Sequence, residues 1–207
     1  MNTMLLKSTA AGAALLALTG VAGAEVLARA TADLNIRSGP GPQYPIVGVI
    51  GVNEEAEIEG CREGSKWCAV NHAGVDGWAY SDYLTAPFEG GEDYVVVTER
   101  PAEALPSVSF EATSSVEVEP VRGELIGRKT AIGTVEPIAP PPAEVTTYIQ
   151  SNRVEPVYLE GEAVVGAVLP ETVEVREIPD YEYRYVYVNQ QPVLIEPETR
   201  RIVYVVR

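Results

Sequence analysis

The stretch from 32 to 86 alternates short apolar runs with turn signals, and this pattern constrains the fold more than any other feature of the chain. Leu34 and Ile36 alternate with polar neighbours, which is the period of a half-buried strand. Ser38-Gly-Pro-Gly-Pro42 then ends the strand, because proline lacks an N–H donor and glycine permits positive φ. Further short apolar runs follow at 46–50, 56–58, 66–70 and 77–84. Short strands at this close spacing predict a small β-barrel.

The residues of this stretch also resemble a known family. Its motifs are Leu34-Asn-Ile-Arg-Ser-Gly-Pro40, Trp67 followed by Val70, and Gly77-Trp78 leading into Tyr83-Leu84. Together they resemble the bacterial SH3-like domain family, and the resemblance implies a binding module of the cell envelope. We therefore predict an SH3-like barrel over residues 25–86.

The N-terminus has the pattern of a secretory signal peptide. A single positive charge at Lys7 precedes an apolar run over 10–21, and Ala22-Gly-Ala24 places small residues before a cleavage point. No later segment approaches ~20 uninterrupted apolar residues, the length that a membrane-spanning helix needs. We therefore predict a signal peptide over residues 1–24, a periplasmic or secreted protein, and no membrane insertion after cleavage.

The chain is acidic, with 15 basic and 30 acidic residues and a net charge of −15. Binding to nucleic acid or to anionic lipid depends on clustered Lys and Arg, which neutralise phosphates. The acidic excess is spread along the chain, so we predict no nucleic-acid partner. Solubility is the plainer interpretation of this charge.

The two cysteines are spaced for a bridged hairpin. A two-residue turn at Gly64-Ser65 would pair Arg62 with Trp67 and place Cys61 directly opposite Cys68. Opposed residues of an antiparallel pair can come within disulfide range, and a secreted protein meets an oxidising compartment. We predict a disulfide between Cys61 and Cys68 rather than free thiols.

Aromatic side chains supply the candidate ligand site. Strand alternation places Trp67 on the opposite face from Val70, and so outside the barrel if Val70 faces the core. Exposed aromatic side chains beside a loop are typical of peptide-binding grooves, whereas the alternative interpretation is that they fill the core. For Trp78 we favour the core. The candidate ligand-binding residues are Tyr44, Trp67, Tyr80, Asp82 and Tyr83, with Asp82 as a partner for a ligand ammonium.

The composition changes after residue 86. Pro, Glu, Val, Ser and Thr dominate residues 87–147, and prolines interrupt every periodic run. Such a chain buries too little apolar surface to offset its ordering entropy. We predict an acidic, Pro-rich, disordered linker over 87–147, in which Tyr94–Thr98 and Glu124–Gly127 are short β-prone islands that could add a strand to a neighbour.

Residues 148–207 predict a second small β unit. Apolar runs at 163–169 and 172–178 precede a strictly alternating segment, Tyr181–Val188, with its tyrosines on one face. Asn189-Gln-Gln191 is a turn signal, and two more strands follow, which gives an antiparallel meander. The tyrosines either pack on the chain or form a carbohydrate or peptide platform, and packing is favoured because a lone meander needs a cover. The segment from Ile178 to Val206 resembles a domain of unknown function that is common in secreted Gram-negative proteins, where it often follows an SH3-like domain.

No catalytic constellation stands out. The only histidine, His72, cannot build a zinc centre, and a Cys–His pair would need a free thiolate. We predict an all-β, non-enzymatic protein without metal or cofactor. Its predicted function is periplasmic binding, in which the SH3-like domain docks a cell-wall (peptidoglycan) peptide or an envelope protein. The alternative is a structural or assembly role of the envelope that acts through the C-terminal β unit.

Overall fold

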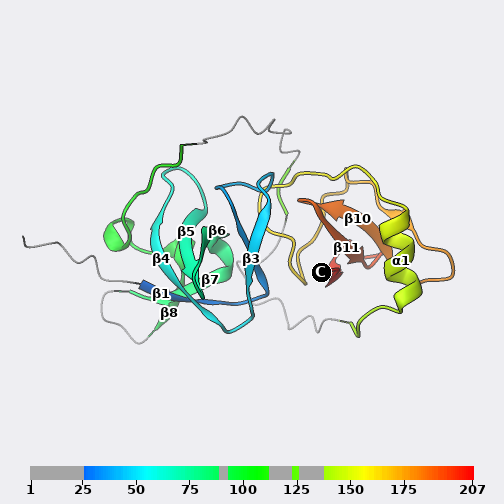
Figure 1. Ribbon diagram of the computed structural model, residues 1–207, viewed down its shortest axis with the longest axis horizontal. Coiled ribbons are helices and arrows are strands. Elements are labelled where there is room, and N and C mark those ends of the chain that lie inside the picture. Colours follow the sequence, from blue (N-terminus) through cyan, green and yellow to red (C-terminus); the bar gives the residue numbers. More distant parts are fainter. Residues whose placement is uncertain (1–25, 89–92, 112–122, 126–137) are drawn as a thin grey trace, which may run out of the picture.

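The computed structural model describes residues 26–88, 93–111, 123–125 and 138–207 (Figure 1). The predicted signal peptide lies outside this range. The structure is built from an eight-stranded and a four-stranded antiparallel sheet, which occupy the left and right halves of Figure 1. The predicted all-β architecture is confirmed, and the described residues include one α-helix, α1 (Ala143–Ser151).

The larger sheet forms the SH3-like unit, with the strand order β3-β2-β6-β5-β4-β1-β7-β8. Strands β2 to β6 lie where the apolar runs predict strands, whereas β1 precedes the predicted stretch and pairs with β4 and β7. A short 3-10 helix, η1 (Ser81–Tyr83), separates β6 from β7. The strands are β1 (Val26–Ala30), β2 (Leu34–Arg37), β3 (Ile46–Ile50), β4 (Glu55–Cys61), β5 (Trp67–His72), β6 (Val75–Tyr80), β7 (Leu84–Pro87) and β8 (Tyr94–Val96).

Part of the predicted linker belongs to this unit, and the linker prediction is corrected for these residues. β8 pairs with β7, as the β-prone island at Tyr94 suggests, and two 3-10 helices follow, η2 (Val97–Glu99) and η3 (Ala102–Ala104). Val97 and Leu105 are buried in the core. A segment with too few apolar residues to form its own core can still become ordered when single apolar side chains pack on a sheet that is already folded. The rest of the predicted linker, 89–92, 112–122 and 126–137, lies outside the described residues.

The smaller sheet is the predicted C-terminal meander, with the order β12-β11-β10-β9. Asn189 and Gln190 join β10 to β11, and both have positive φ (52° and 71°), as a type I′ hairpin turn requires. The segment 163–169 is not the strand that its apolar run predicts, because Gly166 turns with φ of 97° beside β12. The strands are β9 (Arg176–Glu177), β10 (Arg184–Val188), β11 (Gln191–Ile195) and β12 (Ile202–Val205).

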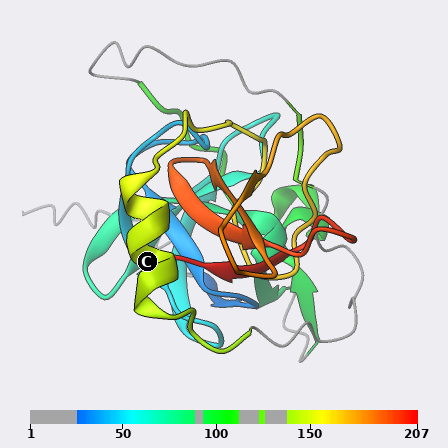
Figure 2. The ribbon, with the colours of Figure 1, turned by 90° about the vertical axis from the view of Figure 1, so that its right-hand side faces the viewer.

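Helix α1 covers the tyrosine face of this sheet (Figure 2). Its buried residues Val145 and Ile149 are four positions apart and so lie on one face of the helix. The Tyr185 hydroxyl donates to the Asn152 carbonyl at 2.7 Å, and the Tyr187 hydroxyl donates to the Ile149 carbonyl at 3.2 Å. The favoured interpretation of the tyrosines as packing residues is confirmed for Tyr185 and Tyr187.

The opposite face of the meander packs on the SH3-like unit. Val186, Val193 and Ile195 of the C-terminal sheet belong to the same buried apolar cluster as Leu34 and Val70 of the barrel. The two units therefore share a continuous hydrophobic core, and the burial of each depends on the other.

Candidate functional site

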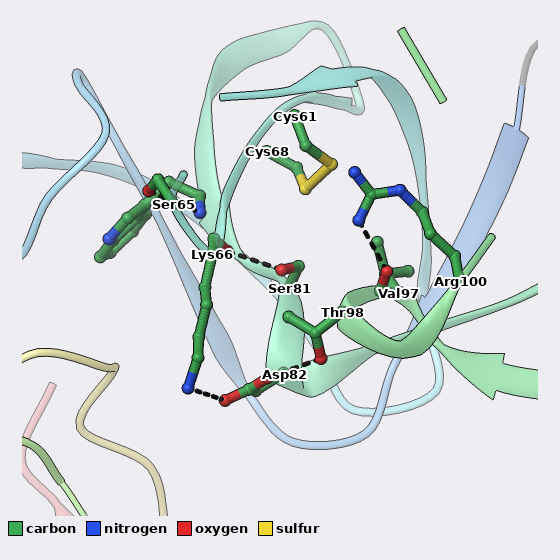
Figure 3. Close-up of a disulfide and its surroundings, with 10 residues drawn as sticks. Cys61, Ser65, Lys66, Cys68, Ser81, Asp82, Val97, Thr98 and Arg100 are labelled. Atoms are coloured by element: carbon green, nitrogen blue, oxygen red, sulfur yellow. Dashed lines mark hydrogen bonds and ion pairs between the residues drawn. A yellow bond between two sulfur atoms is a disulfide. The ribbon is translucent and has the colours of Figure 1, made fainter. Parts of the chain in front are cut away.

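The β4–β5 hairpin carries the predicted disulfide (Figure 3). Cys61 and Cys68 are directly paired across the ladder, with their Cα atoms 3.9 Å apart. The Arg62 N–H donates to the Trp67 carbonyl at 2.9 Å, which confirms the predicted register. Gly64 has φ of +68°, a conformation that glycine adopts without strain.

The residues predicted to bind a ligand are mostly buried. Trp67, Tyr80 and Tyr83 are 1%, 2% and 1% exposed, and Asp82 is 7% exposed. The rings of Trp67 and Tyr80 meet edge to face at 5.3 Å, and Tyr80 lies 6.2 Å from Tyr83. Only Tyr44 is half-buried, and its ring contacts another region, described below. The expectation of an exposed aromatic groove is therefore corrected: four of these side chains are part of the interior.

The C-terminal half of the chain explains the burial of Trp67. The Trp67 Nε1–H donates to Glu160 Oε1 at 3.3 Å, a contact that spans 93 residues of sequence. Strand alternation correctly places Trp67 on the opposite face from Val70, which is also buried. That outer face is covered by a second layer, which the pattern of one strand cannot reveal.

Asp82 holds a small polar cluster together (Figure 3). Lys66 Nζ lies 3.1 Å from Asp82 Oδ2 and 3.0 Å from Glu124 Oε1, while the Thr98 hydroxyl donates to Asp82 Oδ1 at 2.6 Å. Burial by itself lowers the pKa of Lys66, but the hydrogen bonds to Glu124 and Asp82 outweigh it, so the pKa is raised. Lys66 therefore stays charged at neutral pH, and the Asp82 carboxylate is engaged by the protein's own cation.

Beside this cluster lies a polar groove with a volume of about 700 Å³. Its walls come from the loop after β2, from the β4–β5 turn and from the segment that leads into the C-terminal sheet. We call this space the hairpin groove. Its lining residues are Pro40, Gly41, Pro42, Gln43, Arg62, Glu63, Gly64, Ser65, Lys66, Trp67, Glu124 and Glu160.

The hairpin groove carries charges of both signs. Arg62 is exposed at its rim, and Lys66 is partly exposed, with 36% of its side chain accessible. Burial raises the pKa of the Glu160 carboxyl, and the Trp67 hydrogen bond only partly offsets this effect. The groove therefore offers cations and carboxylates within one space.

A second polar contact joins the two units, and it is entirely buried. Arg37 Nε and Nη2 donate to the Glu162 carboxylate at 2.6 and 2.7 Å, and both side chains are 0% exposed. The remaining Arg37 N–H groups donate to the carbonyls of Pro42, Tyr44 and Asn189. All five donors of the guanidinium are thus used, which is what a buried charge requires.

Asn35 extends this network from the same face of β2. Its amide donates to Glu162 Oε1 at 3.0 Å and to Gln191 Oε1 at 2.7 Å, and it accepts from Arg207 at 2.9 Å. Asn35 and Arg37 are the polar positions of the SH3-like motif, and sequence reasoning assigned them no role. Strand alternation places them away from the barrel core, but no local signal identifies Glu162 as their partner.

The single histidine contacts neighbouring groups of the barrel. His72 Nδ1 lies 2.9 Å from the Glu55 carbonyl, and Nε2 lies 3.2 Å from the Glu54 carboxylate. Over the described ranges, no set of three or more His, Cys, Asp or Glu side chains is arranged to hold a metal ion. The same ranges include no helix with the length and apolar character needed to cross a membrane.

Comparison with known protein families finds a match for two segments of the chain. The family described as "Bacterial SH3 domain" matches residues 32–85, and the family described as "Domain of unknown function (DUF1236)" matches residues 148–207. The comparisons with curated proteins and with solved structures found no match. Both predicted resemblances are confirmed: the chain combines a bacterial SH3 domain with a C-terminal domain of unknown function.

Proposed function

We propose that this protein is a non-catalytic binding protein of the periplasm, and that its hairpin groove docks a cell-wall peptide or a segment of an envelope protein. The SH3 domain supports a binding role in general. The observation that carries the proposal is the groove itself, because it offers both signs of charge beside Trp67 and is walled by both domains. The Cys61–Cys68 disulfide and the predicted signal peptide are consistent with an oxidising compartment.

The lining of the hairpin groove favours a zwitterionic peptide. Stem peptides of the cell wall carry free carboxylates and amines, which would meet cations and carboxylates respectively. Arg62 has no side-chain partner among the described residues, so it can donate to a ligand carboxylate. Glu160 and Glu124 also line the groove, and their carboxylates can accept from an ammonium group.

A role without catalysis fits the state of the reactive groups. Both cysteines are used in the disulfide, and His72 contacts the Glu55 carbonyl at the start of β4 and the Glu54 carboxylate just before it. Neither can serve as an activated nucleophile and its base in this arrangement.

Retention on purified peptidoglycan sacculi tests the proposal. The chain from residue 25 onward should co-sediment saturably, and Arg62→Ala should weaken retention about tenfold through the loss of a charge-assisted hydrogen bond. Arg29→Ala is the matched control, because Arg29 is a partly exposed arginine on β1 outside the groove. Both variants should unfold at the temperature of the parent protein.

The possible outcomes test the role of the hairpin groove and the cell-wall ligand separately. Equal losses for Arg62→Ala and Arg29→Ala would mean that general charge, and not the groove, causes retention. Absence of sedimentation by the folded parent would overturn the wall ligand. Pull-down experiments with variants substituted within residues 148–207 would then test the alternative, an assembly role through the C-terminal unit.

A further inference from the structure

Residues 105–110 lie along the SH3 domain as an added extended segment, which we call the strap. The Cys61 N–H donates to the Pro106 carbonyl at 3.0 Å, and the Val108 N–H donates to the Cys61 carbonyl at 3.1 Å. This is a parallel bridge between Cys61 and Ser107. The described ladder between β1 and β4 runs as far as the pair Val26–Ile58, and the strap lies along β4 beyond that pair, at Cys61.

Gly60 makes room for the strap. A Cβ atom at this position would lie 2.6 Å from the Pro106 carbonyl oxygen and 2.7 Å from Val108 Cγ1. Both distances are far shorter than a carbon atom tolerates, and the first contact is with backbone. The close approach of the strap to β4 therefore depends on the absence of a side chain at residue 60.

The strap ends in an aromatic contact. The Phe110 ring meets the Tyr44 ring at 5.4 Å and the Trp78 ring at 5.6 Å, both edge to face. Val108 and Phe110 are partly buried against the core, whereas Ser107 and Ser109 are exposed. Over residues 107–110 the strap thus presents every second side chain to the SH3 domain, as a strand ligand does.

Few interactions hold the strap in place. No side chain of residues 105–111 makes a hydrogen bond or an ion pair with another described residue. Within the described part of the chain, the backbone of the strap makes two hydrogen bonds, both with Cys61, and Pro106 has no N–H to add another. Apolar contacts of Leu105, Val108 and Phe110 supply the remainder.

We propose that Gly60, Cys61, Tyr44 and Trp78 form a peptide-binding surface that the strap occupies in cis, and that an extended segment of a partner protein displaces it. The partner segment would carry an apolar residue followed two positions later by an aromatic ring, the pattern of Val108 and Phe110. This is strand addition, in which backbone hydrogen bonds give affinity and alternate side chains give specificity. The surface is separate from the hairpin groove, so the proposal does not depend on a cell-wall ligand.

Tethering sets the terms of competition. A segment of the same chain is present at an effective concentration on the order of millimolar, so a free peptide competes poorly while the strap is intact. Weakening the strap should therefore unmask the surface. Phe110→Ser does this without altering Tyr44, Trp78 or Gly60, and Ser109→Ala is its matched control at an exposed position.

A synthetic peptide with the sequence of residues 104–111 is the probe. It should bind Phe110→Ser saturably in a tryptophan-fluorescence titration or by calorimetry, and at least about tenfold more weakly to the parent and to Ser109→Ala. A peptide with Ser in place of Phe110 should not bind. Failure of the folded Phe110→Ser protein to bind the peptide, or equal binding by all three proteins, would overturn the proposal.

Hydrogen exchange of the parent protein gives a test that needs no variant to fold. Excess peptide should accelerate exchange of the Val108 amide, which leaves with the strap, while the Cys61 amide stays protected by the incoming peptide. Unchanged Val108 exchange at the highest peptide concentration would contradict displacement.

Gly60→Ala should abolish binding of the peptide, because the added Cβ blocks any backbone in that position.

Discussion

Two ion pairs between described residues join the SH3 domain to the C-terminal half of the chain, and they differ in almost every physical respect. Arg37 and Glu162 form a two-bond pair whose side chains are both 0% exposed. Lys66 and Glu124 form a single contact of 3.0 Å whose side chains are 36% and 57% exposed. Each contact lies beside the loop after β2, but only the second faces the hairpin groove.

The difference indicates which contact maintains the structure and which is available to a ligand. A buried charge that loses its partner keeps its full desolvation cost, so the Arg37–Glu162 pair holds the units in one arrangement. An exposed pair is screened by water and salt and contributes little. Lys66 and Glu124 can therefore exchange partners with a ligand at small cost, whereas Arg37 and Glu162 cannot.

The largest effect should come from breaking the buried pair. Arg37→Met removes the cation and leaves the Glu162 carboxylate unpaired in the interior, which should lower the free energy of unfolding by about 3–5 kcal/mol. Urea unfolding monitored by circular dichroism measures the change.

A double variant sharpens this test. Arg37→Met combined with Glu162→Leu removes both charges, and its loss of stability should be smaller than the sum of the two single losses. Additive losses would show that the two side chains act independently, contrary to the geometry.

Asn189 should give the next largest effect, because its side chain ties the β10–β11 turn to the segment that leads to Glu162. Its side chain accepts from the Leu159 N–H at 2.8 Å and donates to the Leu159 and Gly161 carbonyls at 3.0 Å. Asn189→Ala should cost about 3 kcal/mol, since it leaves these groups unpaired and puts alanine at positive φ. Asn189→Gly loses the same bonds without the backbone strain, so it should be about 1 kcal/mol more stable than Asn189→Ala. Equal stabilities would contradict the strain argument.

The sequence predicts what is local in this molecule. The disulfide follows from the register of one hairpin, and the predicted turn over 189–191 is found at Asn189–Gln190, one residue shorter because Gln191 already belongs to β11. The β2 to β6 strands follow from apolar runs bounded by glycine and proline. Each of these signals acts over fewer than about ten residues, the range in which pattern reasoning works best.

The interface could not be predicted in the same way. Arg37 and Glu162 are 125 residues apart, and Glu162 is one of 30 acidic residues with nothing in its neighbours to distinguish it. Trp67 is assigned to the correct strand face, but its cover comes from the other domain. Burial of the candidate site is thus a property of the assembled pair of domains and not of the SH3 sequence.

The composition of the predicted linker does not indicate the two short segments that pack on the rest of the protein. Helix α1 has nine residues, too few to be stable without packing, and its Val145–Ile149 spacing is a weak signal beside three prolines. The strap contributes only Val108 and Phe110 in alternation. Both segments order because a surface exists for them, which an average over the range 87–147 cannot detect.

Removing the exposed pair should have a smaller effect than either change at the buried interface. Lys66→Met takes away a cation from Asp82 and Glu124, but Asp82 keeps its hydrogen bond from Thr98. The expected loss of stability is about 1 kcal/mol. In 0.5 M salt the loss should shrink, since the Debye length falls to only about 4 Å, whereas the Arg37→Met loss should stay constant. If the loss of stability in Lys66→Met did not depend on salt, the Lys66 ion pairs would behave as buried pairs, like Arg37–Glu162.

The smallest effect concerns Glu160, and it should depend on pH. Burial raises the pKa of this carboxyl above its ordinary value of 4.5, so the folded protein holds more protons than the unfolded chain between the ordinary and the raised value. Stability therefore falls as pH rises through this window, and below the window the carboxyl is neutral in both states.

Glu160→Gln removes the titration while the amide oxygen can still accept from Trp67. Relative to the parent, the variant should gain nothing near pH 4 and should be slightly more stable at pH 7, a small gain because the side chain is partly solvated. Urea unfolding of both proteins at several pH values measures this difference. If the difference in stability between the two proteins did not change with pH, the Glu160 carboxylate would be as well solvated in the groove as in the unfolded chain. Glu160 would then have no special tendency to bind the ammonium group of a ligand.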